Sequence, residues 1–218
     1  MTTVKLLITA SMVMLIFVAA TSAQSLENRH QIGLRLGMWN MVTDVRTSVN
    51  TDGVSTSVGS NGFIGGVGYN YWLKENVALD ISVGGMMTDV DTDIDFTGVS
   101  TSTATIGQLL FGVKYYLPVS TSATSVRPYA MLGVGPYIGE QTETKIGTTV
   151  AVESASEYAL GGKLAAGVDF PLSRHFMVGV AAGYNFMNDF DQPIGGSDNY
   201  SGPEFLIGFG YLFGSGVN

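Results

Sequence analysis

Residues 204–213 have the sequence EFLIGFGYLF, in which two kinds of position alternate. Every second residue from Phe205 to Phe213 is large and apolar or aromatic, while Glu204, Gly208 and Gly210 stand among the positions between. A period of two is typical of a β-strand whose faces meet different surroundings. This stretch is therefore predicted to be the last strand of the chain.

Seven upstream segments repeat the same pattern. In each, one face carries aliphatic and aromatic residues, and the other carries mainly glycine and alanine with isolated polar residues. Together with residues 204–213 they predict eight strands. The segments are residues 30–42, 61–72, 77–84, 108–115, 130–139, 158–170 and 176–186.

The composition indicates which face points outward. Charged residues make up 13% of the chain, compared with about 25% in typical soluble domains. The glycine-rich face is too poor in polar residues to coat a protein in water, but it fits the crowded interior of a small barrel. The aliphatic face suits lipid, and a closed barrel pairs every backbone group within it. The predicted fold is an all-β, eight-stranded antiparallel up-and-down transmembrane β-barrel.

The connections between the predicted strands are short and long in turn. The short ones are residues 73–76, 118–126 and 171–174, and the long ones are 43–60, 89–102, 140–155 and 188–200. This alternation is typical of outer-membrane barrels, with short periplasmic turns, long extracellular loops and both termini in the periplasm. We expect β-hairpins within residues 45–58, 89–105 and 142–152, and an irregular fourth loop.

The N-terminus has the features of a secretory signal peptide. Lys5 precedes an apolar run over residues 6–20, and Thr21, Ser22 and Ala23 are small residues suited to cleavage. We expect residues 1–23 to be a signal peptide and residues 24–218 to be the barrel domain. The chain has no cysteine, which excludes a disulfide framework or a thiolate site. Its net charge of −8 disfavours nucleic-acid binding.

With the strands placed, the chain resembles the small outer-membrane barrels grouped around OmpX, the membrane domain of OmpA and the opacity proteins. The likeness covers nearly all of residues 24–218 and implies the barrel fold. The last strand is similar to the insertion signal that the barrel-assembly machinery recognises, with Leu206 and the five residues after Phe213 as departures. The stretches that carry the likeness are residues 65–71, 115–118, 127–135 and the last strand.

Isolated charges occur on the predicted inward face. One interpretation is a polar path for solutes; the favoured one is a salt-bridged interior, because an eight-stranded barrel has room only for its own side chains. These charges are Arg35, Asp80, Lys114, Lys163 and Glu204.

The sequence predicts neither a catalytic site nor a cofactor. His30 and His175 each begin a strand at the predicted periplasmic end, and Asp169 is the one carboxylate expected near His175. A nucleophile needs a base within hydrogen-bond reach, and this pattern does not supply such a pair. The glycines Gly133 and Gly135 lack the helix that a nucleotide-binding loop requires.

Asp89, Asp91, Asp93 and Asp95 alternate along one predicted strand. If extended, neighbouring carboxylates stand about 7 Å apart on one face, with the parity of the outward-facing Val83. They could bridge Ca²⁺ or Mg²⁺ to lipopolysaccharide phosphates. The favoured interpretation is a solvated acidic loop that protects strand edges from aggregation.

The leading functional hypothesis is a structural or surface-interaction barrel that contacts an extracellular protein through its hairpin loops. Its expected partners are outer-membrane lipid, lipopolysaccharide and, during insertion, the barrel-assembly machinery. The alternative is a narrow channel or carrier for small solutes. An enzyme that modifies lipid A is the least favoured of the three.

Overall fold

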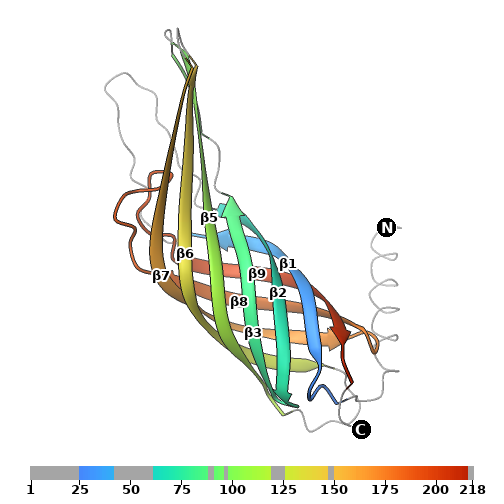
Figure 1. Ribbon diagram of the computed structural model, residues 1–218. Helices are drawn as coiled ribbons and strands as arrows, with labels where there is room; N and C mark the ends of the chain where they lie inside the picture. The colour runs from blue at the N-terminus through green and yellow to red at the C-terminus, as the bar shows by residue number, and fades with distance from the viewer. Residues whose placement is uncertain are drawn as a thin grey trace, which may run out of the picture.

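The computed structural model describes residues 25–41, 61–87, 91–95, 98–118, 126–146 and 150–215. They form a closed β-barrel (Figure 1). Within these ranges, no helix is long and apolar enough to cross a membrane. The barrel strands are β1 (His30–Asn40), β2 (Asn61–Lys74), β3 (Val77–Met87), β5 (Gly98–Tyr116), β6 (Arg127–Ile146), β7 (Val150–Pro171), β8 (Phe176–Met187) and β9 (Gly202–Phe213), and the short β4 (Asp91–Asp95) pairs with β5.

Every barrel strand is antiparallel to its neighbours. The pairing of β3 with β5 continues the meander past β4, and the pairing of β1 with β9 closes it. His30, the first residue of β1, lies opposite Phe213, the last residue of β9. All eight predicted barrel strands and the closed antiparallel topology are therefore confirmed.

The two ends of the barrel differ. One end, here called the turn end, carries residues 25–29, the short connections and the end of β9; the opposite end is called the loop end. At the loop end, β5 pairs with β3 only as far as Thr105 but continues back to Gly98. The strands β6 and β7 likewise stay paired out to Ile146 and Val150.

Strands β4 to β7 thus continue as a sheet beyond the barrel, and β5, β6 and β7 rise well above the other strands in Figure 1. This sheet, residues 91–95, 98–104, 140–146 and 150–160, is here called the extension. It confirms the hairpins predicted within residues 89–105 and 142–152. The hairpin expected within residues 45–58 and the signal peptide expected over residues 1–23 lie outside the described residues.

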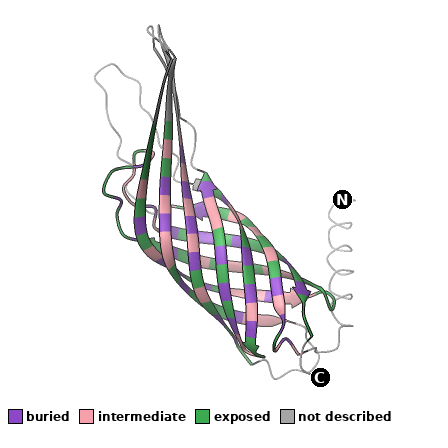
Figure 2. Ribbon diagram, viewed as in Figure 1, coloured by how far each residue is buried: buried purple, intermediate pink, exposed green. Residues whose placement is uncertain are grey.

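Exposure alternates along the barrel strands as the sequence predicts (Figure 2). Leu34, Val134 and Phe209 are each more than half exposed on the outer surface. Near the turn end, aromatic rings gather on this surface: His30 contacts the rings of Tyr69, Tyr71 and Phe213. The continuous apolar outer face, edged by aromatic residues, is the surface that a membrane barrel presents to lipid.

The structure corrects the expected position of the aspartates. Met87 of β3 pairs with Thr105 of β5, whereas Asp91 of β4 pairs with Ser102. The pairing has therefore shifted by one residue, and a shift of one residue exchanges the two faces of a strand. Asp91, Asp93 and Asp95 consequently occupy register positions on the face shared by the buried Ala104 and Ile106, instead of the outward face of Val83.

Candidate functional site

Three ion pairs lie inside the barrel. Arg35 of β1 pairs with Asp80 of β3. Lys163 Nζ of β7 lies 2.9 Å from Glu204 Oε1 of β9. These two pairs contain four of the five predicted interior charges, and Lys114 pairs with Asp169. The pairing favours the salt-bridged interior over a polar path for solutes. Such pairing is required because an isolated buried charge costs several kcal/mol.

The third pair is looser, and its acid was not counted among the predicted interior charges. Lys114 Nζ lies 3.8 Å from Asp169 Oδ2, which is beyond hydrogen-bond reach. Asp169 also accepts a hydrogen bond of 2.8 Å from the Tyr116 hydroxyl. From the sequence, Asp169 was expected only as a neighbour of His175.

Neutral polar side chains extend the Lys163–Glu204 pair. The amide of Asn185 donates to Glu204 Oε2 at 2.8 Å, and the Tyr137 hydroxyl donates to Asn185 Oδ1 at 3.0 Å. Glycine provides the space that the charges occupy: a Cβ at Gly68 would lie 2.7 Å from Arg35 Nη2. The interior charges and their neutral polar neighbours together form a polar layer inside the barrel.

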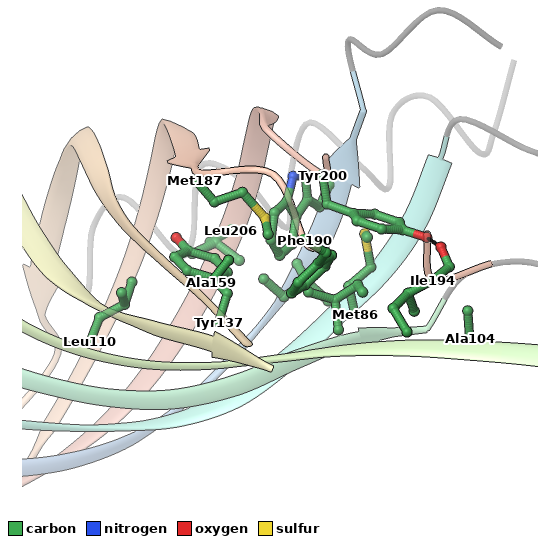
Figure 3. Close-up of a cluster of buried hydrophobic side chains, with 13 residues drawn as sticks. Met86, Ala104, Leu110, Tyr137, Ala159, Met187, Phe190, Ile194, Tyr200 and Leu206 are labelled. Carbon is green, nitrogen blue, oxygen red and sulfur yellow. Dashed lines mark hydrogen bonds between the residues drawn. The ribbon is translucent and has the colours of Figure 1, made fainter. Parts of the chain in front are cut away.

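An apolar cluster closes the loop end of this layer (Figure 3). Part of it comes from residues 188–201, here called the plug loop, whose Phe190, Ile194 and Tyr200 are each at most 4% exposed. We call the whole set the loop-end cluster. Its members are Trp39, Ile64, Met86, Ala104, Ile106, Leu110, Tyr137, Ala159, Met187, Phe190, Ile194, Tyr200 and Leu206.

Hydrogen bonds hold the plug loop in place. The Tyr200 hydroxyl donates to the carbonyl of Ile194, and burial raises the pKa of Tyr200 to about 12, so the donor stays protonated. Gly195 N donates to Gln141 Oε1 of β6 at 2.8 Å. The irregular loop predicted from the sequence is confirmed, and the structure adds that it turns inward and closes the mouth of the barrel.

A second apolar group, here called the turn-end cluster, closes the opposite end. Residues 25–29 fold across this opening: Asn28 N donates to Trp72 O, Trp72 N donates to Arg29 O, and Leu26 is only 2% exposed. The members are Leu26, Trp72, Ala78, Tyr116, Tyr129, Met131, Ala165, Met177 and Leu212.

Glu75 fastens residues 25–29 to the barrel. Its carboxylate accepts hydrogen bonds of 2.9 Å from Ser25 Oγ and Leu26 N, and it pairs with Arg127 of β6. Partial burial alone would raise the pKa of Glu75, but Arg127 and the other donors outweigh it and hold the pKa below its ordinary value. We call this set of contacts the Glu75 clamp.

The two clusters are not among the features predicted from the sequence. The inward face was expected to carry glycine and alanine with isolated charges, but large aromatic side chains also occupy it. The signal was present in the alternation: Trp39 stands four residues after the inward Arg35, and Trp72 stands two after the inward Asn70.

Both histidines lie at the turn end: His30 is the first residue of β1, and His175 directly precedes β8. His30 Nδ1 forms a hydrogen bond of 2.7 Å with the Tyr69 hydroxyl, and the His175 ring contacts the ring of Tyr211. Asp169, the expected neighbour of His175, instead interacts with Lys114 and Tyr116 inside the barrel.

The predicted cation site stays a prediction. Asp89 lies outside the described residues, and for Asp91, Asp93 and Asp95 the structure gives register only. Within the described part of the chain, no group of three or more His, Cys, Asp or Glu side chains is placed to hold a metal ion.

A lipid-facing apolar surface around a closed, paired interior defines a membrane β-barrel. The model of the outer membrane protein β-barrel domain family matches residues 9–213, and the chain belongs to this family. It is therefore a protein of the bacterial outer membrane. No curated protein sequence matches the chain significantly.

Several solved structures are similar to this chain. The attachment invasion locus protein Ail of Yersinia pestis, in complex with the heparin analogue sucrose octasulfate, has a TM-score of 0.51 at 15% identity, with 86% of this chain and 99% of that one covered. A second Ail structure gives a TM-score of 0.50 at 16% identity, with the same coverage of both chains. The outer membrane protein OprG of Pseudomonas aeruginosa has a TM-score of 0.48 at 15% identity, over 87% of this chain and 97% of that one.

Proposed function

We propose that this protein is a closed outer-membrane barrel that presents its extension to an extracellular protein partner. In the proposed orientation, the turn end and both termini lie in the periplasm, and the extension stands outside the cell. The observation that carries the proposal is the paired sheet of β4 to β7 beyond the barrel. Exposed strands of this kind can bind extended segments of other proteins.

The interior supports an interaction role over transport. Apolar side chains close both ends, and the charges between them are paired with one another. A channel needs a continuous wet path, and a carrier needs space for its solute. The contacts of His30 and His175 with aromatic rings support a non-catalytic role.

The charge of the loop end constrains the partner. Thirteen of the eighteen acidic residues of the chain, but only two of its ten basic residues, lie in residues 41–60, 88–105, 140–157 and 188–201. The Ail structure contains a polyanionic heparin analogue; an acidic loop end would repel such a ligand. The partner surface of this chain should be neutral or basic.

The test compares cells that display the full chain with cells that display a shortened extension. Gln141 and Ala155 are paired, so an Asn-Gly turn can join them in place of residues 142–154. The control replaces residues 119–125 at the turn end with the same dipeptide.

Binding is measured to immobilised extracellular-matrix proteins, with heparin as the polyanionic comparison. We expect the full chain and the turn-end control to bind at least one of the proteins and not heparin, and the shortened extension to lose that binding. Equal binding by all three forms, or by none of them, would contradict the proposal. Stable conductance steps of the purified full chain in planar bilayers would favour a channel instead.

A further inference from the structure

Charge is distributed unevenly between the two ends of the barrel. Although the chain as a whole has a net charge of −8, its turn end is basic. One of the acids at this end, Glu75, is already paired with Arg127. The turn end has four of the ten basic and two of the eighteen acidic residues, counted over residues 25–30, 72–77, 116–127, 170–176 and 212–215.

Each short connection at the turn end also presents an exposed leucine. Leu73, Leu117 and Leu172 are 45%, 51% and 36% exposed, respectively. Leu73 and Leu117 each follow an outer aromatic residue by two positions, Tyr71 and Tyr115. The leucines therefore stand at the edge of the apolar outer face, where a side chain can enter the acyl region of a lipid leaflet.

Two of these leucines have an exposed cation beside them. Lys74 directly follows Leu73, and Arg174 follows Leu172 by two positions. Long basic side chains at a membrane edge keep their charge in the polar headgroup region while their stems cover apolar surface. A leucine next to a cation therefore fits a phospholipid, because the acyl chain can contact the leucine while the phosphate contacts the cation.

Arg29 adds positive charge beside the connection between β7 and β8. Its side chain is buried, and its Nη2 donates to the carbonyl of Arg174 at 2.6 Å. Ser173 Oγ accepts a hydrogen bond of 3.1 Å from Phe176 N, which further fixes this connection. Burial lowers the pKa of Arg29, and the positive charge of Arg174 lowers it further. The two guanidinium groups thus lie close together and give this edge a positive potential that attracts anions.

We propose that Lys74 and Arg174 bind the phosphate groups of anionic phospholipids in the leaflet that surrounds the turn end. In the proposed orientation, this is the periplasmic leaflet. An anionic lipid surface favours contact with each nearby Lys or Arg by about fivefold. At an exposed edge, such contacts affect the choice of lipid more than the stability of the fold. Lipid binding here does not depend on the protein partner of the extension.

The test measures lipid binding to the purified full chain in a non-ionic detergent by native mass spectrometry. Phosphatidylglycerol, which is anionic, and phosphatidylcholine, which has no net charge, are titrated with identical acyl chains. We expect phosphatidylglycerol to bind at least about fivefold more tightly, because only its headgroup carries a net negative charge for the two cations to attract.

Paired substitutions locate the binding at the turn end. The double variant Lys74→Gln with Arg174→Gln should bind the two lipids almost equally. Its matched control, Arg46→Gln with Lys145→Gln, removes the same number of positive charges from the loop end and should keep the preference. Lys74→Arg with Arg174→Lys retains both charges and should also keep it. A boiling-dependent gel shift shows that each variant is folded.

Equal binding of the two lipids by the wild-type chain would overturn the proposal, and this comparison requires no variant to fold. An equal loss of preference in the loop-end control would also overturn it, because the preference would then follow net charge alone. Glycerol 3-phosphate distinguishes a lipid site from a site for free phosphate. It lacks acyl chains, so at the same concentration it should not displace phosphatidylglycerol; displacement would contradict a lipid site.

Discussion

At the scale of single residues, the barrel can enclose charged side chains because each is paired with one of opposite charge. Each inward cation faces a carboxylate from another strand, and both members of the Lys163–Glu204 pair are almost completely buried. Removing one member of such a pair leaves the other charge without compensation in a dry interior. The intact pairs should therefore add little net stability, but removing one partner should be strongly destabilising.

We predict that Lys163→Leu destabilises the barrel by about 3 kcal/mol, the scale observed when one partner of a buried ion pair is removed. The folded form should still show its boiling-dependent shift on gels, because the strand pairing is intact. Urea unfolding in lipid vesicles measures the difference. The exposed Lys74 provides the control, since Lys74→Leu should change little; unaltered stability of Lys163→Leu would contradict the role of the pair.

A second prediction at this scale concerns pH. The pKa of Glu75 in the folded protein lies below the ordinary value of 4.5. The contribution of the clamp is therefore fully present above the ordinary value and is lost as the pH falls through the lower, folded-state value. Because the Glu75 side chain is nearly half exposed, the effect should be modest.

Hydrogen exchange at the Leu26 amide reports on the clamp directly, because this amide donates to Glu75. Protection should fall in acid in the wild-type chain. In Glu75→Gln it should be lower at neutral pH and respond less to acid. A wild-type protection factor independent of pH would show that another contact holds residues 25–29.

At the scale of elements, the plug loop depends on a glycine in β6. A Cβ at Gly139 would lie 2.9 Å from Ile194 Cγ1 and 3.0 Å from Phe190 Cζ. A side chain at this position therefore competes with the plug loop for space. Gly133, on the same face of β6, is a matched control, because a Cβ there would meet its nearest neighbours at 3.7 Å, an ordinary contact.

We predict that Gly139→Ala loosens the plug loop at a cost of about 1–3 kcal/mol, the scale of core overpacking. Limited proteolysis should cut within residues 188–201 faster in Gly139→Ala than in Gly133→Ala or the wild-type chain. Identical cleavage in all three proteins would mean that the loop accommodates the methyl group without leaving its site.

At the scale of the whole molecule, the apolar outer face and the closed hydrogen-bonded wall require lipid. We predict that the protein remains in the outer-membrane fraction after a urea wash and shifts in mobility on boiling. Protease added to intact cells should cut only in residues 43–60, 88–102, 140–155 and 188–201, if the loop end faces outward as proposed. Cleavage confined to the turn end would reverse the orientation, and release by urea would contradict the membrane assignment.

The sequence by itself determined the barrel, its eight strands and which face meets lipid. The reason is that strand alternation is a local pattern, visible in consecutive residues. It also determined that Arg35, Asp80, Lys114, Lys163 and Glu204 lie inside, since they share the parity of the inward glycines. Which of them pair depends on the register between strands distant in the chain, and only the tertiary structure decided that.

The closed ends were likewise decided by tertiary structure. Leu26 and Ile194 lie in irregular segments without periodicity, and they are buried because the barrel openings offer them an apolar site. The face of Asp91 differs from the predicted one for a related reason. Both β3 and β4 pair with β5, and the pairing register shifts by one residue between them. Local patterns fix which way a strand's side chains alternate, but burial at an opening and register across strands depend on neighbours that are remote in sequence.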